Sequence, residues 1–453
     1  MAEAVRHDKT ARQLRLLSDA LDSGRLGPVR RLVNTLAPAE IGNLLESLPP
    51  AKRQVVWGLV DAEDDGEVLV HVGDEVRESL LADMDPDEIV AAVEDLDIDD
   101  LADLVEDLPD TVIDEVLKSM DRENRERLEQ VLSYQEDTAG RLMNPDVVTV
   151  RADTTVDVVL RYLRLRGELP EHTDHLYVVS RRHQYLGRIA LQVLLTHEAN
   201  TPINQLIDDE QPAIDVVESA DEVARKFSDH DWISAPVVDD GNILLGRITI
   251  DDVVDIIRDQ AEHQALSAAG LDEDEDMFSP VPRAFRRRVV WLGINLGTAF
   301  LAASVVGRFE GTIEQIVALA VLMPIVAGMG GNAGTQVLTL MVRGLALGQI
   351  GSSNARTLLW KEVRVALMNG LTLGTGLGLI VWIWYRDIPL SLVIASALTI
   401  NLSSAALGGV LVPLALKRMG FDPALAGGVI LTTITDVMGF LSFLGLATLI
   451  LLR

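Results

Sequence analysis

Five long apolar segments fill about the last third of the chain, and they constrain its fold more than any other feature. Each is long enough to cross a hydrocarbon core of about 30 Å as an α-helix, upright or tilted. The sequence therefore predicts a membrane domain over residues 281–453 with five spanning helices. The segments are Val289–Gly307, Glu314–Val342, Val365–Tyr385, Ile388–Leu416 and Ala424–Leu452.

The last segment carries one ionised side chain, Asp436, near its middle. A carboxylate at that depth costs roughly 3 kcal/mol or more and normally faces a bundle interior or a water-filled path. Thr432 lies one turn earlier on the same helix face, and Thr435 lies to one side. Such oxygens are the hard ligands that Mg²⁺ and Ca²⁺ prefer. We therefore expect an ion path here, the alternative being a buried acid bonded to a neighbouring helix.

Charge divides the chain into two parts. The first 280 residues hold 26 basic and 63 acidic side chains, whereas the rest hold 13 and 6. An acidic excess argues against nucleic-acid binding and favours the attraction of cations. The absence of cysteine excludes a disulfide framework and a thiolate metal site. The first 30 residues do not resemble a signal peptide, so we expect the acidic part to be cytoplasmic.

The loops between the apolar segments predict the orientation of the membrane domain. Ten Lys and Arg residues fall on the side of the acidic part and three on the other side. The positive-inside rule then places the N-terminus in the cytoplasm and the C-terminus outside the cytoplasmic membrane.

Residues 1–135 contain short units in which Leu, Ile and Val recur at helical spacing, as in Ile98–Val105. Each unit begins near an Asp or Pro, which is typical of a first helical turn. The pattern predicts an all-α superhelix of short helices. Its Asp-rich outer faces either bind regulatory cations or are merely solvated.

A degenerate repeat follows, divided at residues 136–200 and 201–250. The sequence Leu-Gly-Arg-Ile at 186–189 returns at 245–248. Each copy predicts strand, helix, strand, strand and helix, an α+β domain.

Residues 251–280 predict a long connecting helix followed by an acidic hinge at 271–276. Asp251, Asp255, Asp259 and Glu262 fall on or near one stripe of that helix. Like charges at this spacing repel one another unless a cation or a basic partner intervenes, so we expect these four residues to bind metal ions.

The second apolar segment is interrupted by a glycine-rich run, Gly328–Gln336. Each glycine weakens a helix by about 1 kcal/mol relative to alanine, although small residues also permit close helix packing. The run includes Asn332, which with its polar neighbours needs partners inside a membrane. The single amides of the other spans, Asn295, Asn369 and Asn401, are expected to form interhelical hydrogen bonds.

Several of these motifs resemble those of the MgtE family of magnesium channels. They are residues 324–336, residues 422–424 with 432–440, and the join at 134–143. The resemblance implies a helical N domain, tandem CBS domains, a connecting plug helix and five spans in a homodimer embedded in membrane lipid. It also implies that spans two and five of both copies line one pore. Asp436 would hold hydrated Mg²⁺ there, with Asn332 and the Thr432 region nearby.

The repeat resembles a tandem pair of CBS domains, which commonly sense adenosine nucleotides. Thr249 and Asp252 fit that family's ribose contact, whereas the first copy has Ala190 and Val193 at the same places. ATP is therefore expected at one site per pair at most. The alternative is a purely structural pair.

The sequence thus favours a Mg²⁺-selective uptake channel, gated by cytosolic Mg²⁺ through the N and CBS domains, and not an enzyme. The alternatives are a transporter or exchanger of another divalent ion such as Co²⁺, and a membrane-anchored nucleotide sensor. The plug helix has fewer acids around Arg258 than is usual in the family, and Gly428 offers no ligand, so magnesium-dependent closure and a second pore site are in question.

Overall fold

The computed structural model describes residues 20–21, 26–94, 96–105, 108–267, 269–271, 276–351 and 354–452. The chain forms two compact units. The first contains the chain up to residue 261 together with 274–279, and the second contains 262–273 and everything from residue 280. Most of the expected acidic hinge, residues 272–275, lies outside the described residues.

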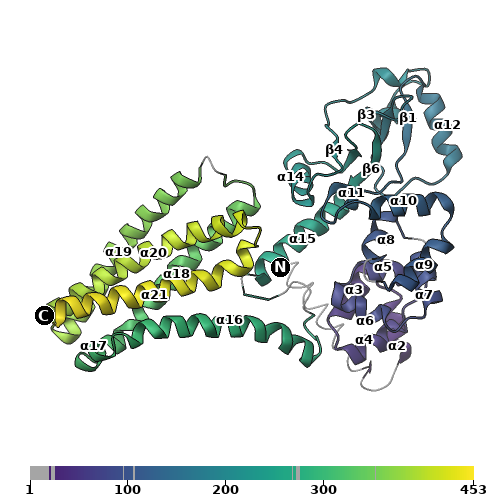
Figure 1. The fold of residues 1–453 in the computed structure, drawn as a ribbon. Coiled ribbons are helices and arrows are strands. Elements are labelled where there is room, and N and C mark those ends of the chain that lie inside the picture. The colour runs from purple at the N-terminus through teal and green to yellow at the C-terminus, as the bar shows by residue number, and fades with distance from the viewer. Residues whose placement is uncertain are drawn as a thin grey trace. The chain divides into compact units, whose positions relative to one another are not determined.

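The first unit begins with a series of short helices, as the apolar spacing predicts (Figure 1). Prolines occupy the first position of three of them, where a missing N–H is no loss. The helices are α2 (Leu26–Val33), α3 (Pro38–Glu46), α4 (Pro50–Trp57), α5 (Asp65–Val70), α6 (Asp74–Leu81), α7 (Pro86–Val93), α8 (Ile98–Val105), α9 (Asp110–Ser119), α10 (Arg122–Leu132) and α11 (Ala139–Leu142).

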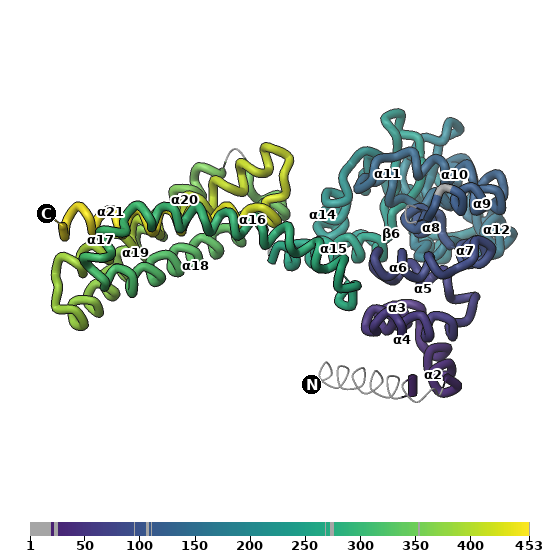
Figure 2. Tube along the Cα trace, turned by 60° about the horizontal axis from the view of Figure 1, so that its bottom comes forward, coloured from purple at the N-terminus to yellow at the C-terminus, as the bar shows by residue number. Residues whose placement is uncertain are grey.

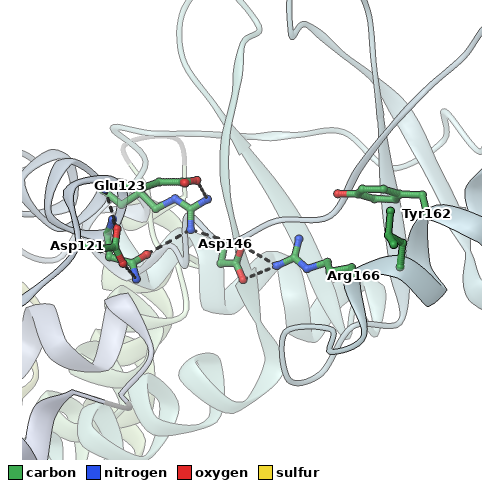
Figure 3. Close-up of a pocket in the computed structure, with 8 residues that line it drawn as sticks. Asp121, Glu123, Asp146, Tyr162 and Arg166 are labelled. Atoms are coloured by element: carbon green, nitrogen blue, oxygen red, sulfur yellow. Dashed lines mark hydrogen bonds and ion pairs between the residues drawn. The ribbon is translucent and has the colours of Figure 1, made fainter.

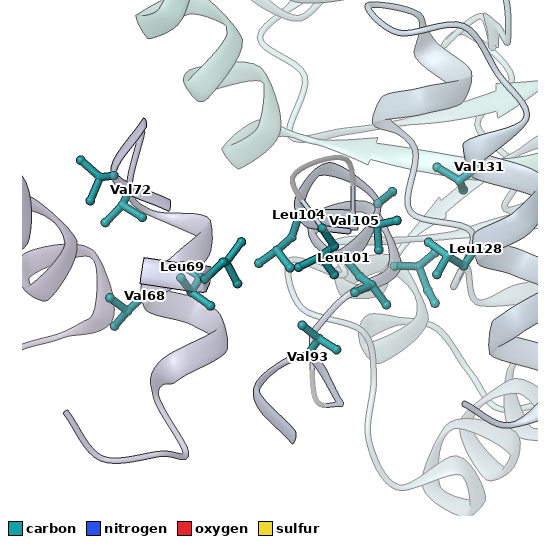
Figure 4. Packing of buried hydrophobic residues seen from close by; sticks show 14 of the residues in the cluster. Val68, Leu69, Val72, Val93, Leu101, Leu104, Val105, Leu128 and Val131 are labelled. Atoms are coloured by element: carbon teal, nitrogen blue, oxygen red, sulfur yellow. The ribbon is translucent and has the colours of Figure 1, made fainter. Parts of the chain in front are cut away.

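Helix α8 lies at the centre of this helical N domain (Figure 4). Its Leu101 and Leu104 are buried against Leu69 of α5 on one side and Leu128 of α10 on the other. Because each short helix can bury only one stripe, the stack is stable through contacts between successive helices. The predicted superhelix is confirmed.

The repeat forms two copies of one α+β unit, as predicted. In each copy the first strand pairs in parallel with the second, which pairs antiparallel with the third. The first copy comprises β1 (Thr149–Arg151), α12 (Val156–Arg166), β2 (His175–Val179), β3 (Tyr185–Ala190) and α13 (Leu191–Thr196). After the short 3₁₀ turn η1 (Ile203–Gln205), the second comprises β4 (Ile214–Asp215), α14 (Ala220–His230), β5 (Ser234–Val238), β6 (Leu244–Thr249) and α15 (Ile250–Ser267).

The segment Asp276–Ser279 packs onto the N domain by a buried ion pair. Arg53 of α4 lies 2.8 Å from Asp276, and the two side chains are only 2% and 5% exposed. Arg53 also donates to the carbonyl oxygens of Leu45 and Leu48. Glu75 accepts from the backbone N–H of Asp276 at 3.2 Å and from the Ser279 hydroxyl at 2.5 Å. The chain that leads to the first span is therefore tied to the N domain.

Within its described residues, the second unit contains five helices that are long and apolar enough to cross a membrane, as predicted (Figure 2). They are α16 (Val281–Gly307), α18 (Ala318–Ala346), α19 (Ala355–Tyr385), α20 (Ile388–Arg418) and α21 (Pro423–Leu451), with the short α17 (Glu310–Gln315) between the first two.

Two details of the second span differ from the expectation. The segment expected to start at Glu314 begins at Ala318, because α17 is a separate helix. The glycine-rich run does not interrupt α18, which is continuous. Gly330 and Gly334 are buried against Asn401 and Leu431, so close packing offsets their low helix propensity.

The buried pair predicts a measurable loss of stability. Asp276→Asn keeps the shape of the side chain but leaves the Arg53 guanidinium unpaired, so it should cost about 3 kcal/mol of local opening free energy. Hydrogen exchange of α4 in the full-length protein measures that cost. Asp61→Asn is the control, because its pair with Arg30 is exposed at 3.4 Å and should contribute less than about 1 kcal/mol. Equal effects of both changes would contradict the prediction.

Candidate functional site

Helix α21 places Asp436 near its midpoint. Asp422 caps the helix, accepting from the N–H groups of Ala424 at 2.8 Å and Leu425 at 3.3 Å. Pro423 in the first turn fixes the start of the helix. From this cap the helix runs to Leu451, and Asp436 is half-buried between its two ends. Asp436 thus lies far from both ends of α21.

The structure separates the predicted pore ligands into two groups. Asp436 is partly accessible, and Thr432 and Asn332 are exposed in the single chain. Thr435 instead is fully buried, and its hydroxyl donates to the Thr432 carbonyl at 3.0 Å. The ligand roles of all four stay predictions, and burial makes Thr435 the least accessible of them.

The two helices that carry these residues pack directly on each other. A Cβ added at Gly427 of α21 would lie 3.0 Å from Leu338 of α18, and one at Gly334 of α18 would lie 3.1 Å from Leu431 of α21. The open face of α18 beside this contact presents Gly328, as well as exposed polar side chains. Those side chains are Asn332, Thr335 and Gln336.

The acidic stripe of α15 forms as predicted and is exposed at Asp255, Asp259 and Glu262. Arg258 lies 3.4 Å from Asp255 and 3.6 Å from Asp259, which offsets part of their repulsion. Asp251 lies 3.3 Å from His172. The metal-binding role of these four acids stays a prediction.

The last turn of α15 belongs to the second unit. There His263 approaches the capping carboxylate of Asp422 at 3.0 Å. The connecting helix therefore contacts the start of the helix that carries Asp436.

A cluster of carboxylates, Asp99, Asp100 and Asp252, lies where α15 begins. The sequence did not indicate that these three acids come together. Burial, followed by the charge of Asp252, raises the pKa of Asp99 at the start of α8 well above its usual value. Burial and Asp97 raise the pKa of Asp100 to about 7, and burial and Asp251 raise that of Asp252 to about 7. One oxygen of Asp99 is buried without a hydrogen-bond partner in the described part of the chain.

These α8 acids were visible in the sequence only as part of a helical repeat. About 150 residues separate them from α15, so spacing could not bring them together. Among the described residues, no three His, Asp or Glu side chains are already gathered around a metal-sized space. A cation at this cluster would therefore bind through its own water or draw the acids closer together.

Thr249 and Asp252 are adjacent, as the ribose-binding prediction requires. The N–H and the hydroxyl of Thr249 both donate to Asp252 at 3.1 Å, and the hydroxyl also contacts Asp251. Thr249 pairs in register with Ser234 across β5 and β6. Their nucleotide role stays a prediction.

Buried polar groups continue from Ser234 into the first CBS copy. The Tyr177 hydroxyl donates to Ser234 at 3.1 Å, and Ser234 donates to Asp174 at 2.6 Å. Within the described residues, side-chain atoms of Tyr185, Gln211 and Arg247 in the CBS pair are buried without a partner. Such unpaired groups indicate a place for water or a polar ligand. His175, which also belongs to the first CBS copy, lies 2.7 Å from Asp174.

A cleft of about 590 Å³ lies between α10 and α12 (Figure 3). Asp146 stands between two guanidinium groups, 2.7 Å from Arg166 and 3.6 Å from Arg127. Arg127 is also paired with Glu123 at 2.7 Å. Because these cations are already neutralised, the cleft is a junction of ion pairs between the N domain and the first CBS copy rather than an anion site.

Comparison with known proteins matches every part of this architecture. The model of the divalent cation transporter family MgtE matches residues 323–446, and that of the MgtE intracellular N domain matches 36–137. CBS domain models match 139–198 and 204–259. A magnesium transporter MgtE of Thermus thermophilus is 32% identical over 442 residues, which cover 96% of this chain and 98% of the relative. The chain belongs to the MgtE family.

A second full-length relative agrees with this assignment, and two solved structures are also similar. One from Enterococcus faecalis is 30% identical over 438 residues, 96% of each chain. The cytosolic domain of the Mg²⁺ channel MgtE, solved in complex with ATP, is 30% identical and covers 53% of this chain and 98% of its own, with a TM-score of 0.48. The soluble part of a magnesium transporter covers 55% of this chain and 99% of its own at 25% identity and a TM-score of 0.47. The family models and the two full-length relatives confirm the resemblance stated from the sequence motifs.

Proposed function

We propose that the protein is a Mg²⁺-selective channel for magnesium uptake, and Asp436 carries this proposal. A carboxylate in the middle of an apolar helix is costly in lipid, and hydrated Mg²⁺ is a partner that offsets its charge. Mg²⁺ loses its water reluctantly, so oxygens of Asp436, Thr432 and Asn332 need only contact the hydration shell. The related proteins named as magnesium transporters support this choice of ion.

The exposed polar face of α18 supports assembly into a homodimer around the ion path. Asn332 and Gln336 would face lipid in a single chain, where their amide groups would lack partners, whereas the Thr335 hydroxyl donates to the carbonyl oxygen of Gly331 at 3.0 Å. A second copy, or a water path between two copies, satisfies them. In this arrangement α18 and α21 of both subunits line the pore.

The proposed orientation follows from the loop charges. The excess of Lys and Arg on the N-terminal side places the acidic unit in the cytoplasm and the C-terminus outside the cytoplasmic membrane. Uptake then brings Mg²⁺ to the side on which the carboxylates lie.

Gating by cytosolic Mg²⁺ is the role that the carboxylate cluster supports. Asp99 and Asp100 of α8 and Asp252 of α15 have raised pKa values because they are buried close to other acids. A divalent cation relieves that repulsion and holds α8 against α15. Since the end of α15 contacts the cap of α21 through His263 and Asp422, the state of this helix can influence the pore helix.

Adenine nucleotide is a second ligand that a specific observation favours. Thr249 lies beside Ser234, and nearby polar atoms of the CBS pair lack partners among the described residues. A ribose and an adenine ring supply hydrogen-bonding groups of the kind that these atoms need. We propose ATP as a ligand of the pair and not as a catalytic substrate.

The pore assignment makes a direct prediction. Asp436→Asn removes the charge and leaves a more apolar span, so the protein should still insert but Mg²⁺ uptake should be abolished. Flux into liposomes that contain the purified protein measures this. Asp387→Asn is the control, because Asp387 caps the start of α20 and asparagine also caps helices well. Flux of Co²⁺ through the wild type in preference to Mg²⁺ would favour the alternative divalent-ion transporter, and normal Mg²⁺ flux in Asp436→Asn would refute the ion path.

The cluster predicts a dependence on pH and on Mg²⁺. Folded-state pKa values raised to about 7 stabilise the contact at low pH, and this stability is lost as pH rises through about 7. A pKa that differs by about one between the closed and open contact changes the opening equilibrium about tenfold. Without Mg²⁺, the hydrogen-exchange protection of α8 should therefore fall about tenfold or more from about pH 6 to about pH 8, after correction for intrinsic rates.

At the higher pH, millimolar Mg²⁺ should restore the protection of α8. Potassium chloride at matched ionic strength screens charge but cannot bridge two carboxylates, so it should restore less. Asp100→Asn combined with Asp252→Asn should weaken both responses, whereas Asp114→Asn, a change at an exposed acid of α9, should not. Equal protection by the two salts would argue against Mg²⁺ as the gating ligand.

The nucleotide proposal predicts a loss of ATP binding without a loss of charge. Thr249→Val removes the hydroxyl that contacts Asp252 and should weaken ATP binding about tenfold, as expected when a bonding partner is lost in a polar site. Isothermal titration of the full-length protein in detergent measures the affinity. Thr154→Val on the loop before α12 is the control, since its hydroxyl donates locally to the carbonyl oxygen of Arg151 at 2.7 Å. If Thr249→Val and the wild type bind ATP equally, Thr249 has no ribose contact.

A further inference from the structure

Asn401 of α20 is the one predicted interhelical amide that the structure places in the packed interior of the described spans. Its side chain is fully buried, and its Nδ2 donates to the carbonyl oxygen of Val326 on α18 at 2.8 Å. Its Oδ1 has no hydrogen-bond partner within the described residues. Asn295 of α16 and Asn369 of α19 are exposed instead.

Two glycines make room for this amide. A Cβ added at Gly439 of α21 would lie 2.8 Å from Nδ2 of Asn401, and one at Gly330 of α18 would lie 2.8 Å from its Cγ. Both distances are shorter than real Cβ contacts. The amide therefore fills the point at which α20 meets both pore helices, and neither glycine can be enlarged while it stays there.

This point lies beside the candidate ion ligands. Gly330 precedes Asn332 by two residues, and Gly439 follows Asp436 by three. At a rise of about 1.5 Å per residue, both ligands lie within about one helical turn of the Asn401 amide. The spacing of α18 and α21 at this level fixes how far Asn332 stands from Asp436.

Stability alone gives no reason to keep an amide here. An unpaired oxygen is unfavourable in a membrane interior, and a small apolar residue would pack without that cost. The hydrogen bond to Val326 instead fixes the register of α20 against α18. Dispersion contacts between small side chains specify that register less sharply.

We propose that Asn401 is a positioning residue for ion selection. It acts through Gly330 and Gly439 to hold α18 and α21 at the spacing that suits hydrated Mg²⁺. This inference rests on the proposed ion path at Asp436, and it concerns a side chain that does not itself touch the ion.

The test compares Mg²⁺ and Ca²⁺ flux in liposomes that contain the full-length protein. Loss of the interhelical hydrogen bond in Asn401→Ala should lower Mg²⁺ flux about fivefold. The ratio of Mg²⁺ to Ca²⁺ flux should fall by a similar factor, because the spacing of α18 and α21 relaxes. Asn369→Ala removes the same chemical group from an exposed place and should change neither quantity.

A second pair of variants tests the contact itself. Gly330→Ala should lower flux and selectivity although alanine favours the helix, and Asn401→Ala should recover part of both in the double variant because it frees the space. Gly439→Ala should act like Gly330→Ala. Gly445→Ala is its control, since nothing lies within 4 Å of a Cβ built there. If Asn401→Ala fails to insert, the Gly439→Ala and Gly445→Ala pair decides.

The outcomes separate this inference from the function on which it rests. Normal Mg²⁺ flux in Asp436→Asn would remove the ion path and this inference with it. If Asp436→Asn is inactive but Asn401→Ala and Gly439→Ala match their controls, the ion path stands and the positioning role is refuted. A fall in flux with unchanged selectivity and no recovery in the double variant would likewise refute positioning and leave Asn401 a packing residue.

Discussion

The electrostatic cost of a carboxylate removed from bulk water is the constraint on which both units of this protein depend. In the membrane unit the cost falls on Asp436, a single acid within an apolar helix. In the first unit it falls on Asp99, Asp100 and Asp252, whose pKa values are raised mainly by burial. In the proposed channel, a divalent cation offsets the cost in both places. The proposed channel therefore uses one chemistry, oxygen ligands around Mg²⁺, for conduction and for its control.

The membrane-spanning helices are subject to a second constraint, because their polar groups need hydrogen-bond partners where water is absent. Helix α18 stays continuous through its glycines because backbone hydrogen bonds within a helix need no outside partner. Gly330 and Gly334 permit close packing against α20 and α21, whereas the exposed polar side chains around Asn332 remain for a second subunit or for water. The same glycine-rich motif thus serves packing on one face and, in the proposed channel, ion chemistry on the other.

Long-range contacts organise the first unit. The Arg53 and Asp276 pair ties the segment before the first span to the N domain, and carboxylates of α8 lie close to those at the start of α15. Oppositely charged groups attract each other directly, whereas two carboxylates repel unless a proton or a cation neutralises them. The first contact therefore needs no Mg²⁺, and the second is suited to respond to Mg²⁺.

The sequence by itself determined the elements of this protein. Apolar length set five spans, the spacing of Leu, Ile and Val set the short N-domain helices, and the repeat that contains Leu-Gly-Arg-Ile set two α+β copies, because each pattern is local. Tertiary structure alone decided which distant groups meet. It joined Asp99 to Asp252, buried Thr435 away from the accessible face of α21, kept α18 unbroken and placed Asn401, unlike Asn295 and Asn369, between α18 and α21. Those outcomes depend on packing between segments far apart in the chain, and no local periodicity records which faces pack together.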